Sequence, residues 1–400
     1  MDQIHRINKL IDKIESELGS ERNKEICDKW NAPEVRQTYM HPVPRRTGQI
    51  PIVADLECPL WAKVLNFKVK DYYTDPLTYL EKQLEMSLYR YDVFRDDSGL
   101  GRTIAIWLGV NFEASILGGR SVYPDHFDPT VDRSLIIIKD EDSLRELEAK
   151  EIDFRNSGIL GLAHEFYGRI RETLPPGWKV IFPDWVIGPF GVASCLRGYE
   201  NILVDLVLAP EFFVKTLDVV SDKMIEYSEA RARFLGIEVE RFNMHHDDVN
   251  CQNFSREAYR RFVFPAEKRL NSFYGGFQYW HSCGNVERLI DDLLEFKGLV
   301  MLDCGGWNNL DVFMEAFKRK GIDEIGIEKR FNPVRDVIGS DDRSIRKMIR
   351  GLYDLAGGDK KLPLDFKIDG IGELGDPDEM VRRVNRFIGI SREFVDERSC

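Results

Sequence analysis

The sequence predicts an α/β fold: a single-domain (β/α)₈ TIM barrel with an N-terminal helical extension. From about residue 100 onward, short apolar runs alternate with helical patterns, which is typical of strands and helices around a parallel sheet. With one earlier run, eight apolar segments qualify as strands. Eight strands interleaved with helices favour a barrel over an open doubly wound sheet.

The expected elements are defined by the period of the apolar residues. The predicted strands lie at 50–56, 103–110, 179–186, 239–244, 276–280, 299–303, 324–328 and 364–368. The predicted helices lie at 76–94, 154–174, 210–235, 256–273, 286–296, 310–319, 341–355 and 378–387. Ser255 can cap the helix that follows it, and Pro210 with Glu211 suits a first helical turn.

Residues 1–48 stand outside this alternation, and prolines and a glycine separate them from the first predicted strand. We expect 1–48 to be a helical extension and 49–400 to be the barrel, because no Gly/Ser linker or fixed-period repeat divides the chain.

Composition excludes several classes of protein. The net charge of -12 argues against a nucleic-acid partner, which needs a basic face. No apolar run is long enough for a membrane span, and the charged N-terminus does not resemble a signal peptide. The seven cysteines lack the paired spacing of disulfide-stapled domains. We therefore expect a cytoplasmic protein with reduced thiols, and a homodimer is one possible assembly.

Polar residues gather just after the predicted strands, and in a barrel these positions converge on one face. The residues that follow strands are Asn111, Glu113, Asp184, Trp185, His245 to Asp248, Asn250, Cys251, His281, Cys283, Asp303, Cys304, Glu328 to Arg330, Asp369 and Glu373. We expect Glu113, Asp184, Asp248, His281, Cys304 and Asp369 to line one cavity. Trp185, Trp280 and Trp307 could wall a flat or apolar ligand, although large aromatic residues are more often part of a core.

His281 and Cys283 form the sharpest pattern. Side chains two apart in an extended segment lie on the same side, so this imidazole and thiolate could share one Zn²⁺. A zinc site needs at least one more ligand, for which Cys304 is the nearest soft candidate. The alternative is that Cys283 is a small buried residue and His281 only forms hydrogen bonds.

The run His245 to Asp248 offers acids, bases or oxygen ligands, and repulsion between its adjacent carboxylates can raise one pKa. We expect His246 and Asp247 to face solvent, because alternate residues of a strand point to opposite sides.

Several stretches together resemble the uroporphyrinogen decarboxylase superfamily. They are Gly188-Pro189-Phe190, Leu196-Arg197-Gly198 with Asp205, Ala209-Pro210-Glu211, Asp247-Asp248 with Phe264-Pro265, and His281-Ser282-Cys283-Gly284-Asn285. The resemblance implies the barrel fold and spans about residues 50 to 387. The decarboxylases carry an Arg-rich first loop, whereas this chain has Asp55-Leu56-Glu57-Cys58 there. We therefore expect no useful turnover of uroporphyrinogen.

In the methyltransferase branch, the residues matching His281 and Cys283 bind zinc together with a later cysteine, whose matching position here is Asp369. The resemblance thus implies a zinc-dependent methyltransferase that works with a corrinoid protein, with Cys304 or Asp369 completing the site. It also favours Asp248 as the inward carboxylate. Asp248 and Asp369 are the expected catalytic residues. The expected substrate-binding residues are Glu113, Asp184, Trp185, His245, Trp307, Glu328 and Arg330.

Two other functions remain open from the residues. One is metal-free decarboxylation of a small carboxylated substrate, with Asp248 and Asp369 as acids and Arg330 holding the carboxylate. The other is a non-catalytic protein that binds a corrinoid or tetrapyrrole.

Overall fold

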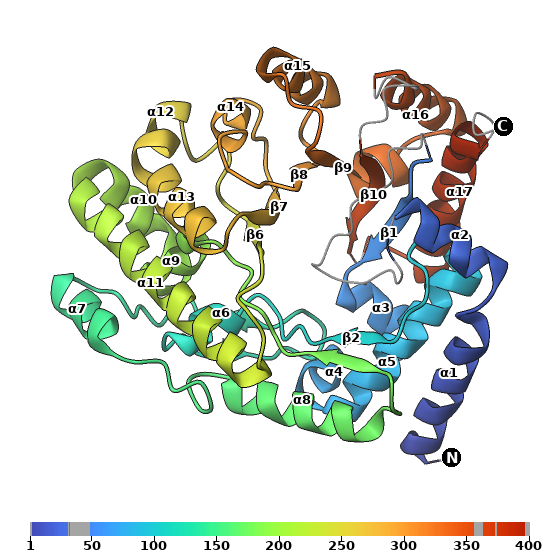
Figure 1. Ribbon diagram of the computed structural model, residues 1–400, viewed down its shortest axis with the longest axis horizontal. Coiled ribbons are helices and arrows are strands. Elements are labelled where there is room, and N and C mark those ends of the chain that lie inside the picture. Colours follow the sequence, from blue (N-terminus) through green and yellow to red (C-terminus); the bar gives the residue numbers. More distant parts are fainter. Residues whose placement is uncertain (1, 31, 33–48, 356–362, 373, 397–400) are drawn as a thin grey trace.

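A curved parallel sheet forms the centre of the molecule (Figure 1). The computed structural model describes residues 2–30, 32, 49–355, 363–372 and 374–396. Six parallel strands follow the order β1-β10-β9-β8-β7-β6. Their bounds are β1 (Ile52–Leu56), β6 (Phe242–His246), β7 (Phe277–Ser282), β8 (Met301–Cys304), β9 (Gly326–Phe331) and β10 (Leu364–Ile371).

The two remaining predicted strands form a separate parallel pair, β2 (Thr103–Ala105) with β5 (Lys179–Ile181). The chain after β5 reaches β6 through an isolated bridge between Ile187 and His245. Within the described ranges no ladder joins β2 to β1, so the expected closed eight-stranded barrel is corrected to a curved sheet with a short second sheet. All eight predicted strands are nevertheless present at their predicted places.

Two buried carboxylates occupy the edge of β1 that a neighbouring strand would otherwise cover. The Ile52 amide donates to Asp97 Oδ2 at 2.8 Å, and the Ala54 amide donates to Asp96 Oδ2 at 3.0 Å. Arg90 approaches Asp96, at 3.3 Å. Because a buried amide without a partner is costly, these side chains replace the missing strand ladder at this edge.

Helices surround the sheet (Figure 1). The longer ones are α1 (Gln3–Glu17), α2 (Glu21–Lys29), α5 (Pro76–Tyr89), α7 (Glu141–Ala149), α8 (Leu160–Thr173), α9 (Pro189–Arg197), α10 (Tyr199–Leu208), α11 (Pro210–Leu235), α13 (Phe264–Phe273), α15 (Leu310–Lys320), α16 (Asp342–Leu355) and α17 (Pro377–Asp396). The short ones are α3 (Cys58–Val64), α4 (Val69–Thr74), α6 (Phe112–Ile116), α12 (Arg256–Ala258) and α14 (Ile290–Leu293). Three π-helical turns (Arg90–Phe94, Tyr259–Val263 and Pro333–Ile338) and an antiparallel pair, β3 (Ser121–Val122) with β4 (Thr130–Val131), complete the elements.

The helix-capping residues predicted from the sequence are found at the helix ends. Helix α11 has the predicted bounds, begins with Pro210 and ends at Gly236 in the left-handed conformation (φ 67°). Ser255 Oγ accepts from the Ala258 amide at 3.1 Å, as expected for a cap. The helix predicted at 286–296 is wrong in extent, since only Ile290–Leu293 is helical. Helices α9 and α10 were not among the predicted ones.

The N-terminal helix α1 packs against α5. Gln3 and Arg6 of α1 both bond Glu81 of α5, and the Arg6 Nε to Glu81 Oε1 distance is 2.5 Å. Residues 33–48 of the expected extension lie outside the described part.

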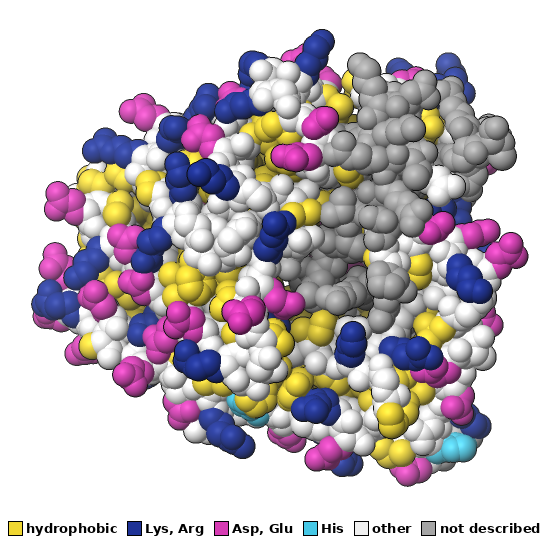
Figure 2. All heavy atoms as spheres, viewed as in Figure 1, with side chains coloured by type: hydrophobic (Ala, Val, Ile, Leu, Met, Phe, Trp, Pro, Cys, Tyr) yellow, Lys and Arg dark blue, Asp and Glu magenta, His cyan; other side chains and the backbone are white. Residues whose placement is uncertain are grey.

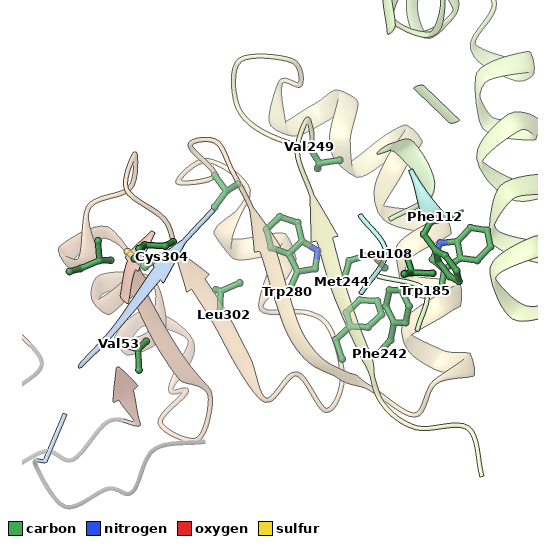
Figure 3. Packing of buried hydrophobic residues seen from close by; sticks show 14 of the residues in the cluster. Val53, Leu108, Phe112, Trp185, Phe242, Met244, Val249, Trp280, Leu302 and Cys304 are labelled. Atoms are coloured by element: carbon green, nitrogen blue, oxygen red, sulfur yellow. The ribbon is translucent and has the colours of Figure 1, made fainter. Parts of the chain in front are cut away.

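Core residues of β6, β7 and β8 point away from the strand face that lines the centre. Figure 3 shows Met244, Trp280, Leu302 and Cys304 packed among buried hydrophobic side chains. Because adjacent residues of a strand point to opposite faces, the neighbouring His281, for example, lies on the inner face.

The visible surface carries interspersed charges of both signs (Figure 2). No helix among the described residues combines the length and apolar character that a membrane crossing requires.

Candidate functional site

Polar side chains of neighbouring strands meet inside the curved sheet at the carboxyl ends of the strands. Register pairs His245 of β6 with His281 of β7, and Asp303 of β8 with Glu328 of β9. These four side chains are at least nine-tenths buried. Charged and polar groups buried together must satisfy one another.

His281 lies between an acid and a thiol. Its Nδ1 is 2.9 Å from Asp303 Oδ2, and its Nε2 is 3.2 Å from Cys283 Sγ. Cys283 Sγ is also 3.6 Å from Asp247 Oδ1. Burial by the surrounding protein, with repulsion from Asp247 and Asp369, raises the pKa of the Cys283 thiol, although its side chain is open to solvent on one side. The free thiol is therefore protonated at neutral pH.

Arg330 organises the acids beside His281. Its guanidinium donates to Glu328 Oε1 at 2.6 Å, to Asp369 Oδ1 at 2.5 Å and to the Tyr279 hydroxyl at 3.0 Å. Burial raises the pKa of Asp369, but the attraction of Arg330 outweighs burial and leaves that pKa below its usual value. Asp369 is thus an ionised partner of Arg330, which does not suit the expected role of proton donor.

A cavity of about 420 Å³ opens beside these groups. His245, His281, Cys283, Glu328 and Arg330 line it from β6, β7 and β9. A further wall comes from β1 and the segments around it. It includes Asp55 of β1, Glu57 and Cys58 just after it, Tyr72 and Tyr73 of α4, and Asp128 from the loop between β3 and β4. The volume suits a small ligand rather than a large one.

The wall that contains Asp55, Glu57 and Asp128 is acidic. Asp128 accepts a hydrogen bond from the Tyr73 hydroxyl at 2.9 Å, and burial raises its pKa. Burial and repulsion from Asp128, Asp55 and Asp369 raise the pKa of Glu57 to about 7.

Several expected residues do not line the cavity, and these expectations are corrected, beginning with Cys304, Trp185, Trp307 and Asp184. Cys304 points to the opposite face of β8, where its Sγ lies 3.9 Å from the Asn308 carbonyl, so it cannot join His281 and Cys283. Trp185 is fully buried and donates from Nε1 to the Ile187 carbonyl. Trp307 is 59% exposed on a loop. Asp184 bonds the Trp185 amide and lies 3.8 Å from Arg231.

The acidic pair after β6 is reversed relative to the expectation. Asp247, not Asp248, lines the cavity, and His246 is buried against Glu267 at 3.1 Å instead of facing solvent. The strand continues to His246, and the bend that follows turns Asp247 toward Cys283. The alternation of side chains along the strand therefore does not predict the direction of residues beyond its end.

Glu113 supports the cavity wall from behind. Its Oε1 accepts from the amides of Val186 and Ile187, which themselves line the cavity. Burial raises the pKa of Glu113 to about 7. This residue positions backbone and is not exposed to the cavity.

The donor set at His281 fits the beginning of a zinc site. One nitrogen and one sulfur donor face each other, and Asp303 holds the other ring nitrogen as in carboxylate–histidine–zinc arrangements. Across the described ranges, no group of three or more His, Cys, Asp or Glu side chains is arranged to hold a metal ion. Glu373 lies outside the described residues.

Sequence reasoning passed over Tyr279, Asp247, Glu57 and Asp128 as site residues. Alternation along β7 could have found Tyr279, because it shares a face with His281 and Cys283. Asp128 comes from a loop between β3 and β4 that has no strand pattern. No local signal in the sequence identifies it.

Comparison with known proteins agrees with this architecture. Residues 103–349 match the family model described as "Uroporphyrinogen decarboxylase (URO-D)". A 155-residue stretch is 26% identical to a "Methylated-thiol--coenzyme M methyltransferase" of Methanosarcina mazei and covers 39% of each chain. The alignment thus spans less than half the length of that relative. A solved structure, "methyltransferase from Methanosarcina mazei", superposes with a TM-score of 0.63 at 13% identity, covering 93% of this chain and 98% of that one.

Proposed function

Because this chain belongs to the uroporphyrinogen decarboxylase family, we propose that it is a methyltransferase whose reacting thiol is activated by Zn²⁺ at His281 and Cys283. The observation that carries the proposal is the approach of His281 Nε2 to Cys283 Sγ at 3.2 Å, on the wall of a cavity. The methyltransferase relatives support the same reaction class.

A zinc ion bound there would lower the pKa of a substrate thiol and keep the thiolate nucleophilic at neutral pH. Residues of this chain would position the zinc ligand His281. Asp303 lies 2.9 Å from Nδ1 of His281, and by accepting the proton of Nδ1 it would leave the lone pair of Nε2 for the ion. His281 and Cys283 would hold the ion, and the substrate sulfur would supply a further donor.

The Arg330 cluster would keep this region rigid and ionised. Arg330 is held by Glu328, Asp369 and Tyr279, and it also lies 3.3 Å from Asp303. Through Asp303 it reaches the zinc ligand His281. Asp369 therefore acts in this proposal as a positioning residue and not as an acid.

The methyl donor in this proposal is a corrinoid carried by a partner protein, as the resemblance to the corrinoid-dependent methyltransferases implies. Metal-free decarboxylation would need Arg330 to hold the substrate carboxylate. Since Glu328 and Asp369 already occupy its guanidinium, no observation favours that alternative.

Metal analysis tests the zinc assignment. The wild-type protein, produced in zinc-supplemented medium and dialysed, should carry ~1 zinc per chain. His281→Ala and Cys283→Ser should lose it, while Cys251→Ser, at a half-buried cysteine outside the proposed donor pair, should retain it. A wild-type protein without zinc, or variants that keep it, would refute the assignment.

A transfer assay tests the activity. Methylcobalamin and a small thiol are incubated with each protein, and demethylation of the corrinoid is followed by absorbance. Wild type and Cys251→Ser should accelerate the reaction, and the two ligand variants should not. A zinc-loaded wild type that leaves the rate unchanged would refute methyl transfer to a thiol from this donor.

A further inference from the structure

The two walls of the cavity differ in chemistry. One wall carries His281 and Cys283, and the other carries Glu57, Asp128 and aromatic rings. In the sheet order, β10, β9 and β8 separate β1 from β7, so the acidic wall and the sulfur-binding pair occupy different parts of the same curved surface (Figure 1).

The cations that line the cavity are already neutralised by carboxylates. Arg330 pairs with Glu328 and Asp369, Lys367 lies 3.3 Å from Asp55, and Arg90 lies 3.3 Å from Asp96.

Glu57, Asp128 and Asp247 line the cavity and have no ion-pair partner among the described residues. The cavity therefore holds more carboxylates than cations. Burial raises the pKa of Glu57 and of Asp128, and a nearby cation favours their ionised form and hence a negative field. Such a field attracts a cation and repels an anion.

Aromatic rings stand beside these carboxylates. Tyr72 and Tyr73 pack edge to face at 4.9 Å between centroids, and Tyr73 lies 6.0 Å from Trp107. All three line the cavity. The Tyr73 hydroxyl donates to Asp128, so this ring lies directly beside the carboxylate. Carboxylates with aromatic rings form the environment that stabilises an ammonium group.

The hydroxyl group of Ser98, which also lines the cavity, lacks a hydrogen-bond partner among the described residues. Ser98 is 97% buried. Since a buried hydroxyl without a partner costs free energy, Ser98 indicates that a polar ligand or water completes this part of the cavity.

We propose that the thiol substrate is a small aminothiol, whose positively charged ammonium group binds at Glu57, Asp128 and the neighbouring aromatic rings. This inference rests on the proposed function, because it assumes that the sulfur end lies at His281 and Cys283. In the reaction the thiol loses its proton, and its sulfur forms the bond to the methyl carbon. The electron pair of the broken cobalt–carbon bond stays on the corrinoid, and the ammonium end is unchanged.

Binding of three thiols of similar size tests the charge preference by isothermal titration calorimetry. Cysteamine is the cation, 2-mercaptoethanol is neutral and 2-mercaptoethanesulfonate is the anion. Cysteamine should bind about tenfold more tightly than 2-mercaptoethanol, and the anion should bind most weakly. Equal affinities, or tightest binding of the anion, would overturn the proposal.

Variants of single carboxylates test which residues cause the preference for cysteamine over 2-mercaptoethanol. Asp128→Asn and Glu57→Gln should each remove most of the advantage of cysteamine and leave the affinity for 2-mercaptoethanol unchanged. Asp323→Asn, an exposed aspartate on the turn before β9, is the control and should change neither. If both cavity variants keep the full advantage of cysteamine, the ammonium does not bind at this wall.

Failure of this inference can be separated from failure of the proposed function. Cys283→Ser should weaken all three thiols alike and preserve their order. If Cys283→Ser weakens all three but the anion binds best in wild type, the sulfur site stands and the ammonium site does not. If cysteamine binds best and no methyl transfer occurs, the ammonium site stands and the proposed reaction does not.

Discussion

Asp303 on β8 holds the ring of His281 on β7 through a 2.9 Å contact to Nδ1, and this contact leaves Nε2 facing Cys283. Asp303 is 1% exposed, so its charge depends on its partners rather than on water. The other carboxylate oxygen of Asp303, Oδ1, lies 3.3 Å from Arg330 Nε. One carboxylate thus links the guanidinium cluster to the candidate zinc ligand.

Asp303→Asn tests whether this link tunes the metal site. The amide removes the negative charge that orients His281, and loss of such a partner costs typically 10- to 100-fold in metal affinity. Zinc affinity is measured by competition with a chromogenic chelator, with exposed Asp311→Asn on α15 as the control. Unchanged zinc affinity in Asp303→Asn would show that Asp303 does not tune the site.

Asp97→Ala tests the carboxylates that cover the edge of β1. Asp97 accepts from the Ile52 amide at 2.8 Å and pairs with Lys29 and Arg392, and it is 1% exposed. Removing it leaves a buried amide without an acceptor and two cations without their carboxylate, which costs roughly 3–5 kcal/mol. Denaturant unfolding should show this loss. Asp92→Ala removes an exposed partner of Lys13 and should cost less than about 1 kcal/mol. Equal effects would contradict the role of Asp97.

Glu113→Gln tests the buried acid behind the cavity wall. Burial raises the pKa of Glu113 to about 7, so the folded state keeps a proton that the unfolded state has lost above its lower, ordinary pKa. Wild-type stability should therefore fall as pH rises through the window up to about 7. Each pKa unit corresponds to about 1.4 kcal/mol.

Glutamine keeps the oxygen that accepts from Val186 and Ile187 but does not titrate. The melting temperature of Glu113→Gln, measured from about pH 5 to 8, should decline less steeply than that of wild type. Parallel profiles for the two proteins would show that Glu113 has an ordinary pKa in the folded state.

The strands were predictable because their apolar side chains are fully buried on the helix-facing side. Trp280 and Leu302 are examples, and the alternation that buries them also places His281 and Asp303 inside. The lack of a strand ladder between β1 and β2 in the described part of the chain was not predictable. The gap beside β1 is covered by the side chains of Asp96 and Asp97, and a polar loop before a strand has no periodic signal.

The site was predictable where it lies within a strand and not where it lies beyond one. Cys304 follows Asp303 directly, so alternation places the two on opposite faces, and the thiol is excluded from the site. Asp247 and Asp128 lie on bends and loops, whose direction depends on tertiary packing. Their positions could not be derived from spacing.

Asp247 and Asp248 can be distinguished by the reactivity of Cys283 in metal-free protein. Burial raises the pKa of this thiol, and the nearby charge of Asp247, with Oδ1 at 3.6 Å from Sγ, raises it further. Asp247→Asn removes that charge, so the pKa of Cys283 should fall and a larger fraction of the thiol should be ionised at neutral pH. Because the thiolate is the nucleophile, alkylation by iodoacetamide should accelerate several-fold. Peptide mass spectrometry separates Cys283 from the other cysteines.

The control variant Asp248→Asn keeps Asp247 beside the thiol of Cys283 and should leave the alkylation rate unchanged. Faster alkylation in Asp248→Asn but not in Asp247→Asn would reverse the assignment and restore Asp248 as the carboxylate of the site.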